Sequence, residues 1–158
     1  MRNRHWIVIA GLLAIVALLA ACNSAPNVEW TVEVSGKVET PLALDYNTLV
    51  AMPQTDLKDV LMDKAVGEDE ATTWSGVAIA DIFKKAGVTA YSSVTATAAD
   101  GYIIEISKDE MQGALIALKK GDEWISKAEP DKGPLRLICP QTPANRWVYQ
   151  IQSIQVNP

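Results

Sequence analysis

Residues 74–107 read WSGVAIADIFKKAGVTAYSSVTATAADGYIIEIS, and they carry the clearest fold signal in the chain. Apolar side chains recur at helical spacing from Ile79 to Ala86, which predicts a helix with one buried face. Gly87 follows where a left-handed helix stop belongs. We expect the preceding segment, Trp74–Val77, to be a tight connection into this helix.

The second half of the same stretch predicts two paired strands. Val94 to Ala98 alternate in a pattern typical of a core strand. Asp100-Gly101 is a turn signal, and Tyr102–Ile106 is β-rich. We therefore expect helix, strand, turn and strand in that order, with the rest of the chain forming sheet and cover around them.

Shorter segments precede this unit. Asp45 is a good N-cap for one helix that ends before Pro53. Leu57–Ala65 fits both a helix and a strand, and its position favours the strand. The predicted segments are a half-buried strand at Val28–Val38, a short strand at Leu42–Leu44, a helix at Tyr46–Met52, a strand at Leu57–Ala65 and an exposed acidic loop at Gly67–Thr73.

After the unit, Ser107 and Glu110 have the spacing of a capping box, which predicts a brief helix ended by Gly113. The apolar parity of the final strand changes at Gln152-Ser153, so we expect a bulge there. The other predicted segments are strands at Ala114–Leu118, Pro134–Cys139 and from Trp147 onward, with loops at Lys119–Asp122, Glu129–Gly133 and Pro140–Asn145. This pattern predicts one compact α+β domain of mixed sheets and a few short helices.

The N-terminus has the layout of a bacterial lipoprotein signal. Arg2 and Arg4 precede an apolar run that ends in Leu19-Ala20-Ala21-Cys22. The alternative is an uncleaved anchor with an incidental cysteine. We expect residues 1–21 to be the signal peptide, Cys22 to carry lipid, 22–28 to be a short linker and 29–158 to be the domain. The predicted location is the extracytoplasmic face of a membrane, with attachment through the acyl chains.

Composition excludes several function classes. Without Arg2 and Arg4, the 14 basic residues fall to 12 against 19 acidic ones, so the net charge is near −7. An acidic chain without a basic run is a poor nucleic-acid binder. The only histidine, His5, lies in the signal, so ordinary zinc, haem or copper sites and Ser/His or Cys/His catalysis are not expected. No phosphate-binding glycine loop is present.

A few polar residues remain as candidates for ligand binding: Asp100, Tyr102, Arg136, Arg146 and Trp147. Each has a structural alternative: Asp100 bonding its own turn, Arg136 pairing with an acid, and Trp147 capping the core. Cys139 shares a strand face with Leu137, which favours a small buried side chain over a reactive or metal-bound thiol. We predict no catalytic residue and no metal ligand.

The order of the segments resembles the oxidoreductase molybdopterin-binding domain family, which has the sulfite-oxidase-like fold. The similarity spans Trp30–Val156. The matching pieces are Gly36-Lys37-Val38 with Pro41-Leu42, Met52-Pro53, Trp74-Ser75-Gly76-Val77, Asp81-Ile82, Ala86-Gly87-Val88, Ala99-Asp100-Gly101-Tyr102, Gly133-Pro134-Leu135-Arg136-Leu137 with Pro140, and Trp147 through Val156.

The resemblance implies a molybdopterin cofactor whose metal is held by a cysteine just before the tryptophan segment. Here that stretch, Ala65–Thr73, has no cysteine, and Cys139 lies elsewhere. The loop that would help to hold the cofactor phosphate, Gln141–Arg146, has no glycine or lysine. We therefore predict a non-catalytic module that binds a small molecule or an envelope protein, with the cofactor left unknown. The alternative is a molybdopterin-dependent oxidoreductase with an atypical ligand set.

Overall fold

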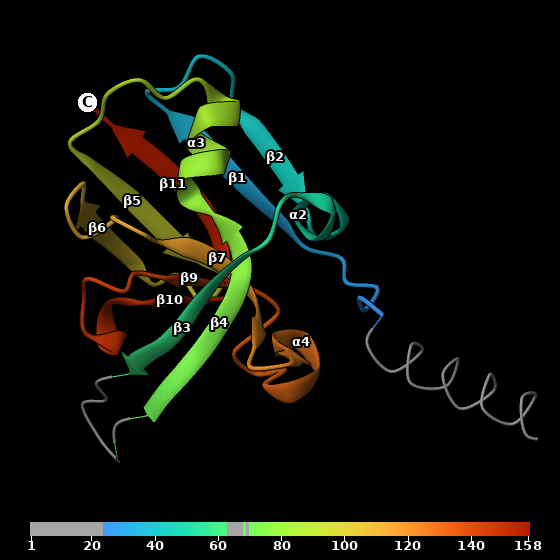
Figure 1. Cartoon of the computed structure of the whole chain (residues 1–158). Coiled ribbons are helices and arrows are strands. Elements are labelled where there is room, and N and C mark those ends of the chain that lie inside the picture. The colour runs from blue at the N-terminus through green and yellow to red at the C-terminus, as the bar shows by residue number, and fades with distance from the viewer. Residues whose placement is uncertain (1–23, 63–67, 69) are drawn as a thin grey trace, which may run out of the picture.

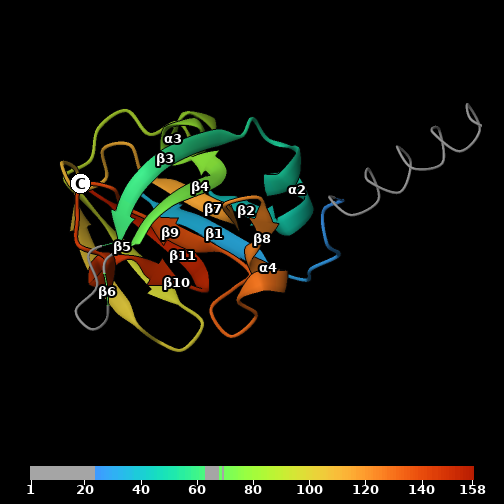
Figure 2. The same cartoon turned by 60° about the horizontal axis from the view of Figure 1, so that its bottom comes forward.

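Two β-sheets and three short α-helices make up the part of the chain that the computed structural model describes, residues 24–62, 68 and 70–158. Figures 1 and 2 show the two sheets lying against each other, with α3 at one end of the molecule. The predicted signal peptide and Cys22 lie outside the described residues. The helices are α2 (Tyr46–Ala51), α3 (Ile79–Ala86) and α4 (Ile125–Ala128), with a 3-10 turn η1 at Ala144–Arg146.

The first sheet has the strand order β2-β1-β11-β5-β6. Its central β1 and β11 are parallel, and the other neighbours are antiparallel. A register shift between Ile151 and Ser153 in β11 confirms the predicted bulge. The strand bounds are β1 Thr31–Gly36, β2 Leu42–Asp45, β5 Ser93–Ala98, β6 Ile103–Ser107 and β11 Ile151–Asn157.

The second sheet has the order β10-β9-β7-β4-β3, and β8 also pairs with β7. β7 lies between β4 and β9, and all of Leu115–Leu118 is buried. Burial on both faces explains why this strand has a continuous apolar run rather than an alternating one. The strand bounds are β3 Thr55–Met62, β4 Glu70–Ala78, β7 Leu115–Lys120, β8 Glu123–Trp124, β9 Arg136–Ile138 and β10 Val148–Tyr149.

One hydrophobic core joins the two sheets. Val34 of β1, Ile154 of β11 and Val94 of β5 are buried in the same cluster as Leu115–Leu118. Ile82 of α3 is buried in it too. The prediction of one α+β domain with mixed sheets and short helices is therefore confirmed.

The helix and strands of the stretch that opened the sequence analysis are confirmed, but its start is not. Trp74–Val77, expected as a tight connection, lies inside β4, which runs directly into α3. The acidic segment predicted to be a loop also belongs partly to β4, since Glu70 pairs with Met62 of β3. Hydrogen bonds to β3 satisfy the backbone of this segment. Its acidic composition gave no sign of a strand, which is why a loop was predicted. Gly87 adopts φ 71°, the predicted left-handed stop.

The capping-box contacts form without the expected helix. Glu110 Oε2 accepts from the Ser107 backbone nitrogen at 2.8 Å, and Ser107 Oγ accepts from the Glu110 nitrogen at 3.4 Å. The segment that follows is a series of turns, which ends at Gly113 with φ 73° and leads into β7. The predicted final strand is divided as well, because Gln150 (φ 50°) separates β10 and β11, which lie in different sheets.

Strands β3 and β9 and helix α4 differ from the sequence predictions in smaller ways. The strand interpretation of the ambiguous segment after Leu57 holds up to Met62, the end of β3; the residues beyond it, 63–67, are outside the described part. The predicted strand Pro134–Cys139 is shorter, Arg136–Ile138. Helix α4 was not expected. No helix within the described residues is long and apolar enough to cross a membrane.

Candidate functional site

Arg136 is the most deeply buried charged side chain among the described residues, at 1% exposure. Its guanidinium carbon lies 5.2 Å from the ring centroid of Trp74 and 4.5 Å from that of Tyr149. The guanidinium pairs with Glu129, whose carboxylate also accepts from Lys120 Nζ at 3.3 Å. Arg136 is thus held between two aromatic rings and an acid, as the structural alternative anticipated.

Burial lowers the pKa of Arg136 to about 10, so the side chain remains a cation at neutral pH. Lys120 Nζ lies 3.1 Å from Glu70 Oε1 and thereby extends the ion pair into a chain of four charges. We call Glu70, Lys120, Glu129 and Arg136 the ionic cluster. Because each basic member already has a carboxylate partner, neither is left over for a negatively charged ligand.

Trp147 and Arg136 meet at the same aromatic ring. The Trp147 ring contacts Trp74 edge-on, with 5.9 Å between centroids and 88° between planes. Its indole nitrogen donates to the Cys139 carbonyl at 2.9 Å. Trp147 is 2% exposed, so it is part of the core.

Arg146 lies apart from Arg136, beside the capping-box contacts. It pairs with Glu110 Oε1 at 2.9 Å and donates to the Glu105 carbonyl at 3.1 Å. Hydrogen bonds from Ser107, and then the charge of Arg146, lower the pKa of Glu110. Arg146 is therefore paired with an acid as well.

Asp100 and Tyr102 form a third location, the turn between β5 and β6. Asp100 Oδ1 accepts from the Tyr102 backbone nitrogen at 2.9 Å, a turn that bonds its own backbone. Tyr102 is 42% exposed. The five residues predicted to bind a ligand thus fall in three places, and none lines any of the three described cavities. Their ligand role stays a prediction.

Cys139 is fully buried, as its position on the strand face predicted. Its sulfur lies 3.9 Å from the sulfur of Met111. Burial raises the pKa of the thiol to about 12, so the thiolate is absent at neutral pH. A buried, protonated thiol is a poor nucleophile, in line with the prediction of a small buried side chain.

The largest described cavity, about 540 Å³, lies beside α3. Helix α3 continues directly from the last residue of β4, Ala78, and so lies at the opposite end of β4 from its first residue, Glu70 (Figure 1). We call it the α3 cavity. Its apolar wall comes from four separate parts of the chain: Leu57 of β3, Ile79 and Phe83 of α3, Tyr91 in the loop after α3, and Met111 and Leu115 from the turn before β7 and its first residue.

Two lysines supply the charge around the α3 cavity. Lys84 comes from α3, and Lys108 comes from the turn after β6, with its Nζ 5.9 Å from the ring centroid of Tyr91. The Tyr91 ring contacts Phe83 edge-on at 5.2 Å, and burial raises the pKa of Tyr91. None of the described residues that line the cavity is acidic, although acidic residues outnumber basic ones in the chain.

Sequence reasoning missed this cavity. The amphipathic pattern of α3 was visible, and it placed Phe83 on the buried face and Lys84 beside it. Nothing in the sequence indicates that Leu57 and Met111, far away in the chain, come to the same helix. Those contacts depend on the pairing of β4 with β3 on one side and β7 on the other.

A second cavity, about 490 Å³, lies near the end of the β3–β4 hairpin where the resemblance expects the metal-binding cysteine. Glu70, Glu123 and Glu129 line it, together with Lys120. Three carboxylates would repel a negatively charged cofactor, and Lys120 is already paired. Among the described residues, no group of three or more His, Cys, Asp and Glu side chains is placed to hold a metal ion. These residues do not fit a thiolate-ligated molybdopterin.

Comparison with known proteins gives a family and a fold. The family model described as "Oxidoreductase molybdopterin binding domain" matches residues 20–158. No curated protein gives a significant match. Among solved structures, the chain is similar to the sulfane dehydrogenase SoxCD from Paracoccus pantotrophus, with a TM-score of 0.70 and 17% identity. That match covers 85% of this chain and 40% of the SoxCD chain, so this protein spans about two fifths of the larger one.

Proposed function

The chain belongs to the oxidoreductase molybdopterin binding domain family, and from this premise we propose that it is a lipid-anchored extracytoplasmic member that binds a small molecule without catalysing molybdenum redox chemistry. The observation that carries the proposal is the state of Cys139. It is the only cysteine within the described residues, and its side chain is fully buried in the core, so its sulfur is not exposed to a cofactor. A molybdenum site of the type implied by the resemblance requires an accessible thiolate.

The charges near the hairpin connection support the same reading. Glu129 holds both Arg136 and Lys120, and Glu70 holds Lys120. An anionic cofactor would have to displace these carboxylates before it gained a basic partner, at the cost of leaving buried charges unpaired. The ionic cluster is therefore better explained as a structural feature than as an anion-binding site.

The α3 cavity is the proposed binding site. Its volume lies within the range of about 300 to 1,000 Å³ that is usual for small-molecule sites. Its wall is apolar with a few polar groups at the edge, which is the composition that such sites share.

The proposed location rests on the sequence of the N-terminus. A basic start, an apolar segment and Leu19-Ala20-Ala21-Cys22 are the parts of a lipoprotein signal. Growth of cells with radiolabelled palmitate tests it, because the wild-type chain should incorporate label and Cys22→Ser should not. Equal labelling of both chains would contradict anchoring through Cys22.

The metal and pterin content of the protein purified from its native host tests the non-catalytic proposal. We expect no stoichiometric molybdenum by elemental analysis and no pterin fluorescence after oxidation and extraction. The competing function is a molybdopterin-dependent oxidoreductase with an atypical ligand set, which the family membership favours. About one molybdenum and one pterin per chain would establish that function and overturn ours.

A further inference from the structure

We infer that the α3 cavity binds a single-chain amphipathic anion of the fatty-acid type, with the chain against the apolar wall and the carboxylate between Lys84 and Lys108. This inference rests on the proposed function and names the ligand class of the same site. The wall, the charges at the edge and the place of the cavity in the fold each support it.

The wall favours a flexible aliphatic chain. Ile79, Met111 and Leu115 are buried and present aliphatic or thioether surface to the cavity. Methionine adapts its shape to irregular apolar ligands. The Phe83 and Tyr91 rings pack edge-to-face against each other and add aromatic surface to the same wall.

The edge favours an anion. Lys84 and Lys108 come from different elements and both line the cavity. Within the described part of the chain, neither lysine forms an ion pair, whereas Lys120, Arg136 and Arg146 each do. Among the described residues, no carboxylate lines the cavity that could attract a cationic ligand instead. The charge at the edge is therefore complementary to a carboxylate.

The site is separate from the one that the family resemblance implies. Thr55 and Ala78 line the α3 cavity, and they lie at the open end of the β3–β4 hairpin. The connection expected to hold a metal ligand follows Met62 at the other end. Seven residue steps of strand, from Thr55 to Met62, separate the two by roughly 23 Å at about 3.3 Å per residue.

Calorimetry on the full chain in phosphatidylcholine nanodiscs tests the inference, with the heat from empty discs subtracted. Decanoate should bind at one site per chain. Decanol should bind about tenfold more weakly, and decyltrimethylammonium should show no saturable binding. Octanoate should bind more weakly than decanoate by about fourfold for each buried CH₂ group lost.

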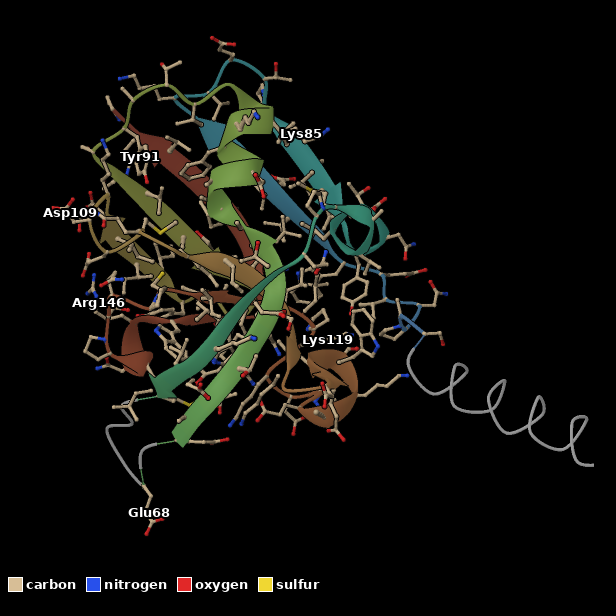
Figure 3. All side chains as sticks on the ribbon, viewed as in Figure 1. Glu68, Lys85, Tyr91, Asp109, Lys119 and Arg146 are labelled. Atoms are coloured by element: carbon tan, nitrogen blue, oxygen red, sulfur yellow. The ribbon has the colours of Figure 1, made fainter. Side chains whose placement is uncertain are left out.

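Adjacent lysines on α3 provide a matched control. Lys84 lines the cavity, whereas Lys85 does not, and Figure 3 shows Lys85 on the opposite side of α3 from Tyr91. The double variant Lys84→Gln/Lys108→Gln should bind decanoate about tenfold more weakly, because both ion pairs to the carboxylate are lost. Lys85→Gln should bind like the wild type. Melting temperatures should stay close together, because all three lysines are exposed.

The possible results distinguish a failure of the fatty-acid inference from a failure of the non-catalytic proposal. Equal binding of decanol and decanoate, or unchanged binding by the double variant, would overturn the anion assignment. If the heat of decanoate addition scales with the amount of lipid and not with the amount of protein, decanoate enters the bilayer and the α3 cavity is not its binding site. If the protein is free of molybdenum, either of these results leaves the non-catalytic proposal intact. Molybdenum and pterin in the native protein would overturn that proposal, whether or not decanoate binds.

Discussion

The guanidinium carbon of Arg136 lies 4.5 Å from the ring centroid of Tyr149, its direct neighbour across the β9–β10 ladder. Trp74 lies on the same guanidinium at 5.2 Å, and Glu129 pairs with it. Strands β4 and β10 and the end of α4 therefore all pack against this one cation. Arginine suits this position because its planar group can stack on rings and bond a carboxylate at once.

Arg136→Ala should therefore unfold the protein more easily. The change removes a stacked side chain and leaves Glu129 without its buried partner, so we expect a loss of about 3 kcal/mol in the free energy of unfolding. Urea denaturation followed by tryptophan fluorescence measures it. Arg146→Ala is the matched control, because Arg146 is 35% exposed and its ion pair is worth about 1 kcal/mol or less. A stable Arg136→Ala variant that has lost ligand binding would assign Arg136 to a site instead.

The buried thiol of Cys139 makes stability depend on pH in the alkaline range. Its pKa rises from 9.0 to about 12 on folding because burial disfavours the thiolate. Between these values the unfolded chain loses the proton and the folded chain keeps it. The contribution to stability is complete below pH 9 and falls above it by up to about 1.4 kcal/mol per pH unit.

Cys139→Ala isolates this effect from the lysines and tyrosines that titrate in the same range. The free energy of unfolding of the wild type should fall more steeply than that of Cys139→Ala between pH 9 and 11, and the two should run parallel below pH 8. Parallel curves throughout would mean that the thiol is exposed. A thiol reagent at pH 8 should likewise label Cys139 only after denaturation.

Gly76 is required where β4 pairs with β7. A Cβ atom at Gly76 would lie 2.0 Å from the Ile116 carbonyl oxygen, which belongs to the backbone of a central strand and has little freedom to move. Gly76→Ala should therefore lower the free energy of unfolding by about 3 kcal/mol.

Gly101→Ala is the comparison. Gly101 has φ 87° in the β5–β6 turn, and no atom of the described residues lies within 4 Å of an added Cβ. Only backbone strain opposes this change, so we expect a loss of about 1 kcal/mol. Thermal unfolding of both variants by circular dichroism measures the difference. Equal losses would mean that the contact between β4 and β7 relaxes easily.

Filling the α3 cavity should block its ligand without unfolding the protein. Ala80 is an exposed residue of α3 that lines the cavity. Ala80→Leu keeps good helix propensity and adds three carbons beside the apolar wall, so decanoate affinity should fall about tenfold at an unchanged melting temperature. Ala51→Leu, on the exposed surface of α2 and outside the cavity, should change neither quantity. Equal binding by both variants would place decanoate elsewhere.

The local elements could be predicted because each rests on short-range physics. Asp45 caps α2 by accepting from the Thr48 nitrogen, and Gly87 ends α3 in the left-handed conformation. The bulge after Ile151 follows from a change of side-chain parity within one strand. The burial of Cys139 was likewise visible from its alternation with Leu137. The order of these elements was enough to indicate the family.

The candidate site had no such local signature. Arg136 is buried and paired because Glu129, Trp74 and Tyr149 contact it. These residues come together only when β4, β7, β9 and β10 assemble into one sheet. The α3 cavity exists because Leu57 of β3 and Met111, in the turn before β7, reach one helix from the two sides of β4. Helix and strand periodicity state which face of an element is buried, but they do not state which other element buries it. Long-range strand pairing determines which elements are in contact. It therefore also determines that Lys120, Arg136 and Arg146 pair with acids, whereas Lys84 and Lys108 line a cavity.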